Sequence, residues 1–448
     1  MTDNTGDGQA VIEALLERAK RNGADAADAA RVDVTARSHG QRLGEPETRE
    51  RSEELDLGLR VFVGRRQACV ATADTSPGAL DELAERAVAM AQAVPEDPYC
   101  GLADPSELAA RWTEPDSLDP REPSADDLAE RARVCEDAAR AVDGVTNSEG
   151  ADAAWSRAAL QLAATNGFHG SYAVSKHTVG TAVLAGAGTA MERDYAVHAA
   201  THDEDLEAPV DVGRRAGERA VRRLHPRQAK TGTYPAVYHP RAANSLLRHL
   251  VGAISGPAVA RGTSFLGGRL GEAIFPRGVT VVDDPHRRRG LKSKPFDAEG
   301  LAPHRRDVID GGTLTTWLLS LSSARQLGMT STGHAARGPS SPPSPSPTNL
   351  YMAPGTVAPD ALVGDVAEGI YVTELMGQGV NQVTGDYSRG AAGFWIENGK
   401  LTHPVSEVTL AGNLLEMFAH LTPADDLELR HGIDAPTVHI PGMTVAGQ

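Results

Sequence analysis

Apolar residues recur at helical spacing in several stretches of the first half of the chain. The predicted helices span residues 9–23, 79–94, 128–142 and 211–224. One face of the first helix carries Val11, Ile12, Leu15, Leu16 and Ala19. Gly23 ends this helix, while Ser76-Pro77 and Ser124 precede the next two. Serine caps and first-turn proline favour helix starts, so these positions fix the predicted boundaries.

Segments rich in apolar and β-branched residues predict strands between and after these helices. They span residues 30–37, 55–64, 67–74, 156–166, 171–179, 180–188 and 235–239. Two turn pairs, Asp310-Gly311 and Asn398-Gly399, predict hairpins because these residues accept positive φ at low cost. Residues 225–235 are predicted to be a linker between an N-terminal domain, 1–224, and a C-terminal domain, 236–448.

Proline and serine dominate the segment 336–352. This composition favours a mobile, polyproline-like surface loop with no packed element before about Thr348. A loop beside a binding cleft is the alternative interpretation.

Composition limits the classes of partner. The chain has 448 residues, of which 40% are hydrophobic, so it can bury a sizeable core. Its formal net charge of −16 disfavours a nucleic-acid or anionic-membrane partner, and the short basic run 286–289 is expected to be a solvated loop. Three dispersed cysteines, Cys69, Cys100 and Cys135, form neither a disulfide framework nor a zinc motif. Without an apolar signal or membrane span, we expect a cytoplasmic protein.

Isolated polar residues give weak signals for chemistry. His198 and His202 have a helical metal-site spacing, but their surroundings predict a strand, where they would lie about 13 Å apart. Ser388 lies outside any G-x-S-x-G motif and is expected in a turn, and Gly377 and Gly379 lack the third glycine of a dinucleotide site. Four dispersed histidines could line a cleft, although surface or core positions are the simpler interpretation: His286, His304, His334 and His403.

The segment LLRHLVGAISG, residues 246–256, predicts a core helix with a polar edge. Its apolar stripe consists of Leu246, Leu247, Leu250, Val251 and Ile254. Arg248 and His249 lie off this stripe, and Gly252 suggests close approach of another backbone. Gly256-Pro257 predicts the helix end. No carboxylate occurs between Arg241 and Leu270, so the helix supplies one imidazole and no general base.

Several longer motifs resemble a known family. They include HLVGAISG, RGTSFLGGRLGE, KSKPFDAEG, STGHA, YVTELMGQGVNQVTGDYSRGAAGFWIENG and HPVSEVTLAGNL, with LGLRVFVGRRQACVATAD, VTNSEG and MERDYA in the first half. Together they resemble the PmbA/TldE branch of the TldD/PmbA family over almost the whole chain. The resemblance implies an α+β fold of two domains. The N-terminal domain would be α/β, with a mixed sheet and flanking helices, and the C-terminal domain rich in antiparallel sheet.

The resemblance also implies a division of labour between two chains. The TldD sister carries its metal on a helix with His-Glu, three residues and His, and a later cysteine completes the site. The equivalent positions here fall near Leu247, Arg248 and Gly252, and no cysteine follows residue 135. The implied role is a subunit that binds no metal and is inactive alone. A TldD-like partner would hold the zinc of a heteromeric metalloprotease for unfolded or leader peptides.

Exposed strand edges in the C-terminal domain would hold the peptide by main-chain pairing. The residues expected to line the cleft are Gly377, Gln378, Gly379, Asp386 and Tyr387. An equally weighted interpretation is that the glycines of this segment are needed only for turns and bulges. The alternative function is a non-proteolytic peptide-binding or scaffold protein, possibly homodimeric. A free-standing peptidase is the weakest hypothesis, because the chain lacks a ligand set.

Overall fold

The structure, a computed structural model, describes residues 5–447. The predicted α+β class is confirmed. The first sheet has the order β3-β2-β1-β4-β5-β6, and each of its five pairings is antiparallel, where a mixed sheet was expected. Its strands are β1 (Ala26–Arg42), β2 (Glu45–Val63), β3 (Arg66–Thr72), β4 (Val145–Ala164), β5 (His169–Ala185) and β6 (Glu192–Ala200).

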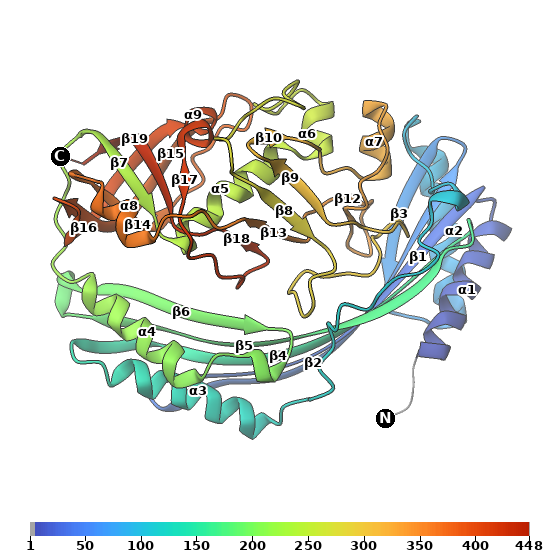
Figure 1. The fold of residues 1–448 in the computed structure, drawn as a ribbon. Helices are drawn as coiled ribbons and strands as arrows, with labels where there is room; N and C mark the ends of the chain where they lie inside the picture. The colour runs from blue at the N-terminus through green and yellow to red at the C-terminus, as the bar shows by residue number, and fades with distance from the viewer. Residues whose placement is uncertain (1–4, 448) are drawn as a thin grey trace.

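The predicted helices cover this curved sheet. They are α1 (Thr5–Arg21), α2 (Pro77–Ala93), α3 (Ala125–Arg140) and α4 (Pro209–Arg222). In Figure 1, α3 and α4 lie on the outer side of the sheet, while the C-terminal half lies in its concavity. A core of small apolar residues joins α3 and α4 to the sheet, among them Ala132, Val183 and Ala216.

The predicted strands are present, but most are longer than expected. The separate segments 171–179 and 180–188 are one strand, β5, because Gly180 pairs with Val197 in an unbroken register with β6. Residues 30–37 lie within the much longer β1. In β2, the polar first half hid the true length of the strand, because residues 45–56 are mostly exposed while residues 57–62 are buried.

The C-terminal half contains two larger sheets. The first has the order β16-β15-β14-β7-β19-β17, and the second β10-β9-β8-β13-β18. The strands of the first are β7 (Gly232–Tyr238), β14 (Glu368–Met376), β15 (Asp386–Glu397), β16 (Lys400–Asn413), β17 (Thr422–Pro423) and β19 (Val438–Ala446). Those of the second are β8 (Val281–Asp284), β9 (Arg306–Asp310), β10 (Thr313–Leu314), β13 (Asn349–Met352) and β18 (Ile433–Asp434). Most pairings are antiparallel, as predicted, with β14–β7 and β13–β18 parallel.

Strand β16 also pairs with β19, through Thr409–Ala411 and Thr444–Ala446. This pairing closes β16, β15, β14, β7 and β19 into a ring. Each of these five strands therefore has a neighbour on both sides over part of its length, which limits the exposed strand edges expected in the C-terminal half. In the second sheet the edge strands β10 and β18 have two residues each.

Short helices complete the C-terminal half. They are α5 (Pro240–Ala253), α6 (Gly256–Ala260), α7 (Leu321–Leu327), α8 (Pro359–Gly364) and α9 (Leu414–His420). Gly256-Pro257 starts α6 rather than ending α5, which is capped at Ile254. The predicted linker 225–235 includes the first residues of β7, which begins at Gly232.

Both predicted hairpins are present, but the turn of the first lies one residue later than the predicted pair Asp310-Gly311. Thr313 pairs with Asp310, which leaves Gly311-Gly312 as the turn, and both glycines have positive φ. Glu397 pairs with Lys400 around Asn398-Gly399, whose φ angles are 49° and 73°. These angles are typical of a type I′ turn, the turn whose twist matches two antiparallel strands.

The proline- and serine-rich segment packs against the first sheet, so the prediction of no packed element before Thr348 is wrong, although much of the segment lies at the surface. The guanidinium of Arg337 is buried and donates a hydrogen bond to the Asp28 carboxylate of β1. A Cβ atom on Gly58 of β2 would overlap the Pro339 carbonyl. Elements also precede Thr348, since β11 (Ala335–Ala336) pairs with β12 (Ser344–Pro345).

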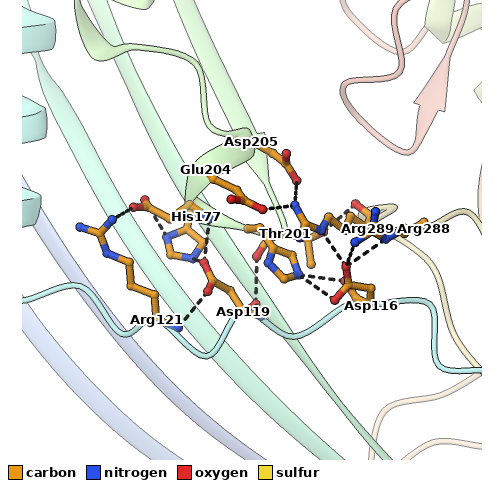
Figure 2. A network of polar contacts seen from close by, with 12 residues as sticks. Asp116, Asp119, Arg121, His177, Thr201, Glu204, Asp205, Arg288 and Arg289 are labelled. Carbon is orange, nitrogen blue, oxygen red and sulfur yellow. Dashed lines mark hydrogen bonds and ion pairs between the residues drawn. The ribbon is translucent and has the colours of Figure 1, made fainter.

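A polar network also joins the two halves (Figure 2). The guanidinium groups of Arg288 and Arg289 donate to the Asp116 carboxylate, and Arg289 also donates to Glu204 and Asp205. Part of the run 286–289 is therefore held between the halves and is not simply a solvated loop. Among residues 5–447, no helix has the length and apolar character to cross a membrane.

Candidate substrate cleft

A cleft of about 880 Å³ separates the concave side of the first sheet from the C-terminal half. Strands β5 and β6 form one wall, helices α4 and α5 contribute further walls, and residues 426–437 close another side. The sheet wall consists of Lys176, Thr178, Tyr195, Val197 and Ala199. These residues alternate along their strands with buried residues such as Val179 and Ala196, which face α3 and α4.

Three faces of helix α5 contact different parts of the protein. Leu246, Leu247, Leu250 and Ala253 are buried in the main core, which confirms the predicted apolar stripe. Pro240, Asn244 and Arg248 recur every four residues, so they share a face, and all three line the cleft. His249 and Gly252 face neither the core nor the cleft. They lie against Tyr387 and Gln382 of the glycine-rich segment, residues 377–387.

The three positions that the family resemblance places near the sister chain's metal site have separate surroundings here. Leu247 is 1% exposed and belongs to the core. Arg248 lines the cleft. A Cβ atom on Gly252 would lie 3.1 Å from the Gln382 amide, so a side chain, and not the expected second backbone, approaches this glycine.

The glycine-rich segment turns back on the start of β15. The N–H of Ser388 donates to the Gly379 carbonyl at 2.7 Å, and the N–H of Asn381 donates to the Asp386 carbonyl at 2.9 Å. A Cβ atom on Gly379 would overlap the Ser388 carbonyl. Gly377 has a φ of 78° in open surroundings. The backbone conformation and packing of this chain therefore explain why glycine occupies both positions.

The predicted cleft residues lie outside the large cleft. Gly377, Gln378, Gly379 and Asp386 are exposed, whereas Tyr387 is buried beneath them. They lie beyond α5, on the side of His249 and Gly252. Ser388 belongs to β15 and not to the expected turn.

A buried polar cluster lies under the glycine-rich segment. The His249 and Tyr387 rings pack edge to face, with centroids 6.0 Å apart. Burial, with a further contribution from Arg389, lowers the pKa of His249 to about 4. Neither His249 Nε2 nor Gln382 Oε1 has a hydrogen-bond partner among the described residues. The position of His249 off the apolar stripe was the available sequence signal for this cluster.

Three of the six lysines and arginines on the cleft walls are paired with carboxylates: Arg215, Arg241 and Arg430. Arg241 donates two hydrogen bonds to Asp194, at 2.6 and 3.0 Å. Arg215 and Arg430 share the Glu207 carboxylate, at 2.5 and 2.6 Å. The first pair links β6 to α5, and the second group links α4 to the C-terminal segment.

Three cations of the cleft have no carboxylate partner within residues 5–447: Lys176, Arg219 and Arg248. Arg219 donates one hydrogen bond of 3.3 Å to the Tyr195 carbonyl. Burial, followed by repulsion from Arg241, lowers the pKa of Arg219 to about 10. Burial and the neighbouring Arg219 lower the pKa of His239 to about 3, so this imidazole is neutral at pH 7.

The histidines singled out in the sequence do not meet at one site. His334 is buried and contacts Asp283 at 3.2 Å, and His198 accepts a hydrogen bond from the Glu207 N–H at 3.1 Å. His202 contacts the Asp116 carbonyl. None of His286, His304 and His403 is among the residues that line the cleft. Within the described chain, no three histidine, cysteine or acidic side chains are grouped as metal ligands.

Family models match most of the chain. The PmbA/TldA metallopeptidase C-terminal domain matches residues 231–447, the central domain 118–224 and domain 1 27–91. The chain belongs to the PmbA/TldD metallopeptidase family. Metalloprotease PmbA of Escherichia coli O157:H7 is 38% identical over 98% of this chain and 96% of its own length. The predicted PmbA/TldE resemblance is thereby confirmed.

Solved structures of this family have the same fold. A Bacteroides thetaiotaomicron protein described as a modulator of DNA gyrase has a TM-score of 0.91 at 26% identity, with both chains covered completely. TldE from Thermococcus kodakarensis has a TM-score of 0.86 at 19% identity, over 98% of this chain and all of that one.

Proposed function

We propose that this chain is the non-metal-binding subunit of a heteromeric metalloprotease. It holds an unfolded or leader peptide, while a TldD-like partner with the His-Glu-xxx-His helix holds zinc and cleaves the peptide. The surroundings of three residues of α5 are the main support for this proposal. Leu247 is in the core, Arg248 faces the cleft and Gly252 faces Gln382. A hydrolytic zinc site needs several ligands and a base, and α5 offers no carboxylate.

Two further observations support a role in proteolysis that depends on a partner. The whole-chain relative is named as a metalloprotease, and a structural neighbour is named TldE, which fits a TldD/TldE pairing. The net charge of −16 argues against a nucleic-acid ligand.

Strand β6 is the best candidate for main-chain pairing with the peptide. It is an edge strand of the first sheet, and its Tyr195, Val197 and Ala199 line the cleft. The N–H of Tyr195 bonds to Asp194 and its carbonyl accepts from Arg219, so its backbone groups point away from β5. Alternation directs the backbone groups of Val197 and Ala199 the same way. Both could therefore bind an extended peptide.

The division of labour is tested by purifying this chain, the TldD-like partner and the pair. Zinc content and cleavage of an unstructured peptide are measured for each sample. We expect zinc only where the partner is present, and full cleavage only from the pair. Stoichiometric zinc and cleavage by this chain alone would overturn the proposal, and full cleavage by the partner alone would favour a scaffold role.

Main-chain pairing is tested with two peptides of identical sequence, one of them N-methylated along its backbone. N-methylation removes hydrogen-bond donors and leaves the side chains unchanged. We expect affinity to fall about tenfold or more, as a few lost hydrogen bonds imply. Equal affinities would exclude strand pairing as the means of holding the peptide.

A further inference from the structure

The cleft has uncompensated positive charge on facing walls. Lys176 projects from β5 and Arg248 from α5, and both are exposed to the cleft without a carboxylate partner in residues 5–447. Arg219 of α4 lies on the same cleft with only a carbonyl partner. The chain as a whole has a net charge of −16, yet these cations on the cleft walls have no carboxylate partner. This arrangement indicates that the cleft binds an anionic ligand.

The acidic residues of the cleft do not neutralise these cations. Asp426 accepts hydrogen bonds from the backbone and hydroxyl of Thr437, at 2.8 and 2.7 Å. Asp434 accepts from the backbone N–H groups of His431 and Gly432. Glu428 pairs with Arg430. Each carboxylate is therefore engaged by groups on its own segment, and none contacts Lys176, Arg219 or Arg248.

The surroundings of Arg248 are themselves cationic. Burial lowers the pKa of Lys292, and Arg248 adds to this effect. Burial also lowers the pKa of His431, where Asp434 opposes the shift and Arg248 and Arg430 add to it. A ligand carboxylate beside Arg248 would relieve this repulsion and could accept two parallel hydrogen bonds from the guanidinium.

We propose that the cleft selects extended peptides that carry carboxylate groups, with Arg248 and Lys176 as the specificity-determining residues. This inference rests on the proposed peptide-holding function. Backbone pairing with β6 would tolerate many sequences, whereas the two cations would distinguish acidic peptides from neutral ones.

The test uses the full chain and two labelled peptides of equal length, one with glutamates and the other with glutamines at the same positions. Fluorescence anisotropy measures both affinities at low and high salt. We expect the glutamate peptide to bind about tenfold more tightly for each cation engaged, and this preference to shrink as salt rises.

Variants identify the residues responsible. Arg248→Gln and Lys176→Gln should each lower the affinity for the glutamate peptide about tenfold and leave the affinity for the glutamine peptide unchanged. Arg214→Gln is the matched control, because Arg214 is exposed on α4, pairs with Asp211 and does not line the cleft. All three positions are exposed, so thermal unfolding should stay near that of the unaltered chain.

The outcomes separate this inference from the proposed function. Repeating the measurement with C-terminally amidated peptides distinguishes the sources of the carboxylate. A glutamate preference that survives amidation supports recognition of acidic side chains, whereas equal binding that weakens about tenfold for both peptides on amidation assigns the same cations to a terminal carboxylate. Equal binding that amidation leaves unchanged would overturn the carboxylate preference and leave peptide holding intact, and no binding of either peptide would overturn both.

Discussion

The guanidinium of Arg337 donates a hydrogen bond to the carboxylate of Asp28, a residue 309 positions earlier in the chain. Arg60 donates to the same carboxylate, at 2.8 Å, and all three side chains are about 4% exposed or less. Although burial alone would raise the pKa of Asp28, the two guanidinium groups hold it below its usual value. One carboxylate therefore fixes the proline- and serine-rich segment to the first sheet.

Asp28→Asn should destabilise the protein by about 3–5 kcal/mol, because it leaves two buried guanidinium groups without their shared anion. Denaturant unfolding measures the change. Asp211→Asn is the matched control, since Asp211 forms an exposed pair with Arg214 and should contribute at most about 1 kcal/mol. Equal effects at the two sites would contradict a stabilising role for the buried pair.

Leu247→Ala should cost about 2–5 kcal/mol of unfolding free energy, because it opens a cavity in the main core. Leu270→Ala, at a leucine that is 38% exposed, should change stability by at most about 0.5 kcal/mol. Thermal unfolding of the two variants compares them directly. A loss of peptide affinity without a loss of stability in Leu247→Ala would instead assign this residue to the binding surface.

Gly379→Ala should destabilise by about 1–3 kcal/mol, because the new methyl group meets the fixed Ser388 carbonyl. Gly78→Ala is the control: it lies in the first turn of α2 with no atom near its Cβ position, and should be neutral or gain up to about 1 kcal/mol. A fully stable Gly379→Ala with impaired peptide binding would favour a contact role for this glycine over a conformational one.

Stability should fall as the pH decreases from about 6.5 towards 4. Burial lowers the pKa of His239 to about 3 and that of His249 to about 4, both below the ordinary value of 6.5. The unfolded chain thus binds protons in this range that the folded chain excludes, so the full contribution exists above pH 6.5 and is lost on acidification. Melting temperatures across this range measure the effect, and His249→Gln should reduce the slope. An unchanged slope would contradict the assignment to His249.

The sequence predicted what depends on local pattern. The stripe of Leu246, Leu247 and Leu250 identifies the buried face of α5, and Asn398-Gly399 identifies a turn, because both follow from neighbouring residues alone. The family resemblance supplied the expectation that α5 occupies the position of the sister chain's metal-bearing helix.

The cleft could not be predicted, because its walls come from distant segments. Nothing near Arg248 in the sequence indicates that Lys176 lines the same cleft, because the two residues come from different halves of the chain. The charge of Asp28 similarly gives no sign that Arg337 will cover it. The composition of the proline- and serine-rich segment by itself favours disorder, but the ion pair between Arg337 and Asp28 holds the segment against the first sheet.

The closure of the five-strand ring has a consequence for folding of the protein during its synthesis. Strand β7 opens the C-terminal half, yet one of its two neighbours, β19, is the last strand of the chain. During synthesis, β7 and β16 therefore each lack one neighbour until β19 has been made. A chain that stops before Val438 would expose these two unpaired edges, which are templates for aggregation, so the ring protects its own edges only once β19 is in place.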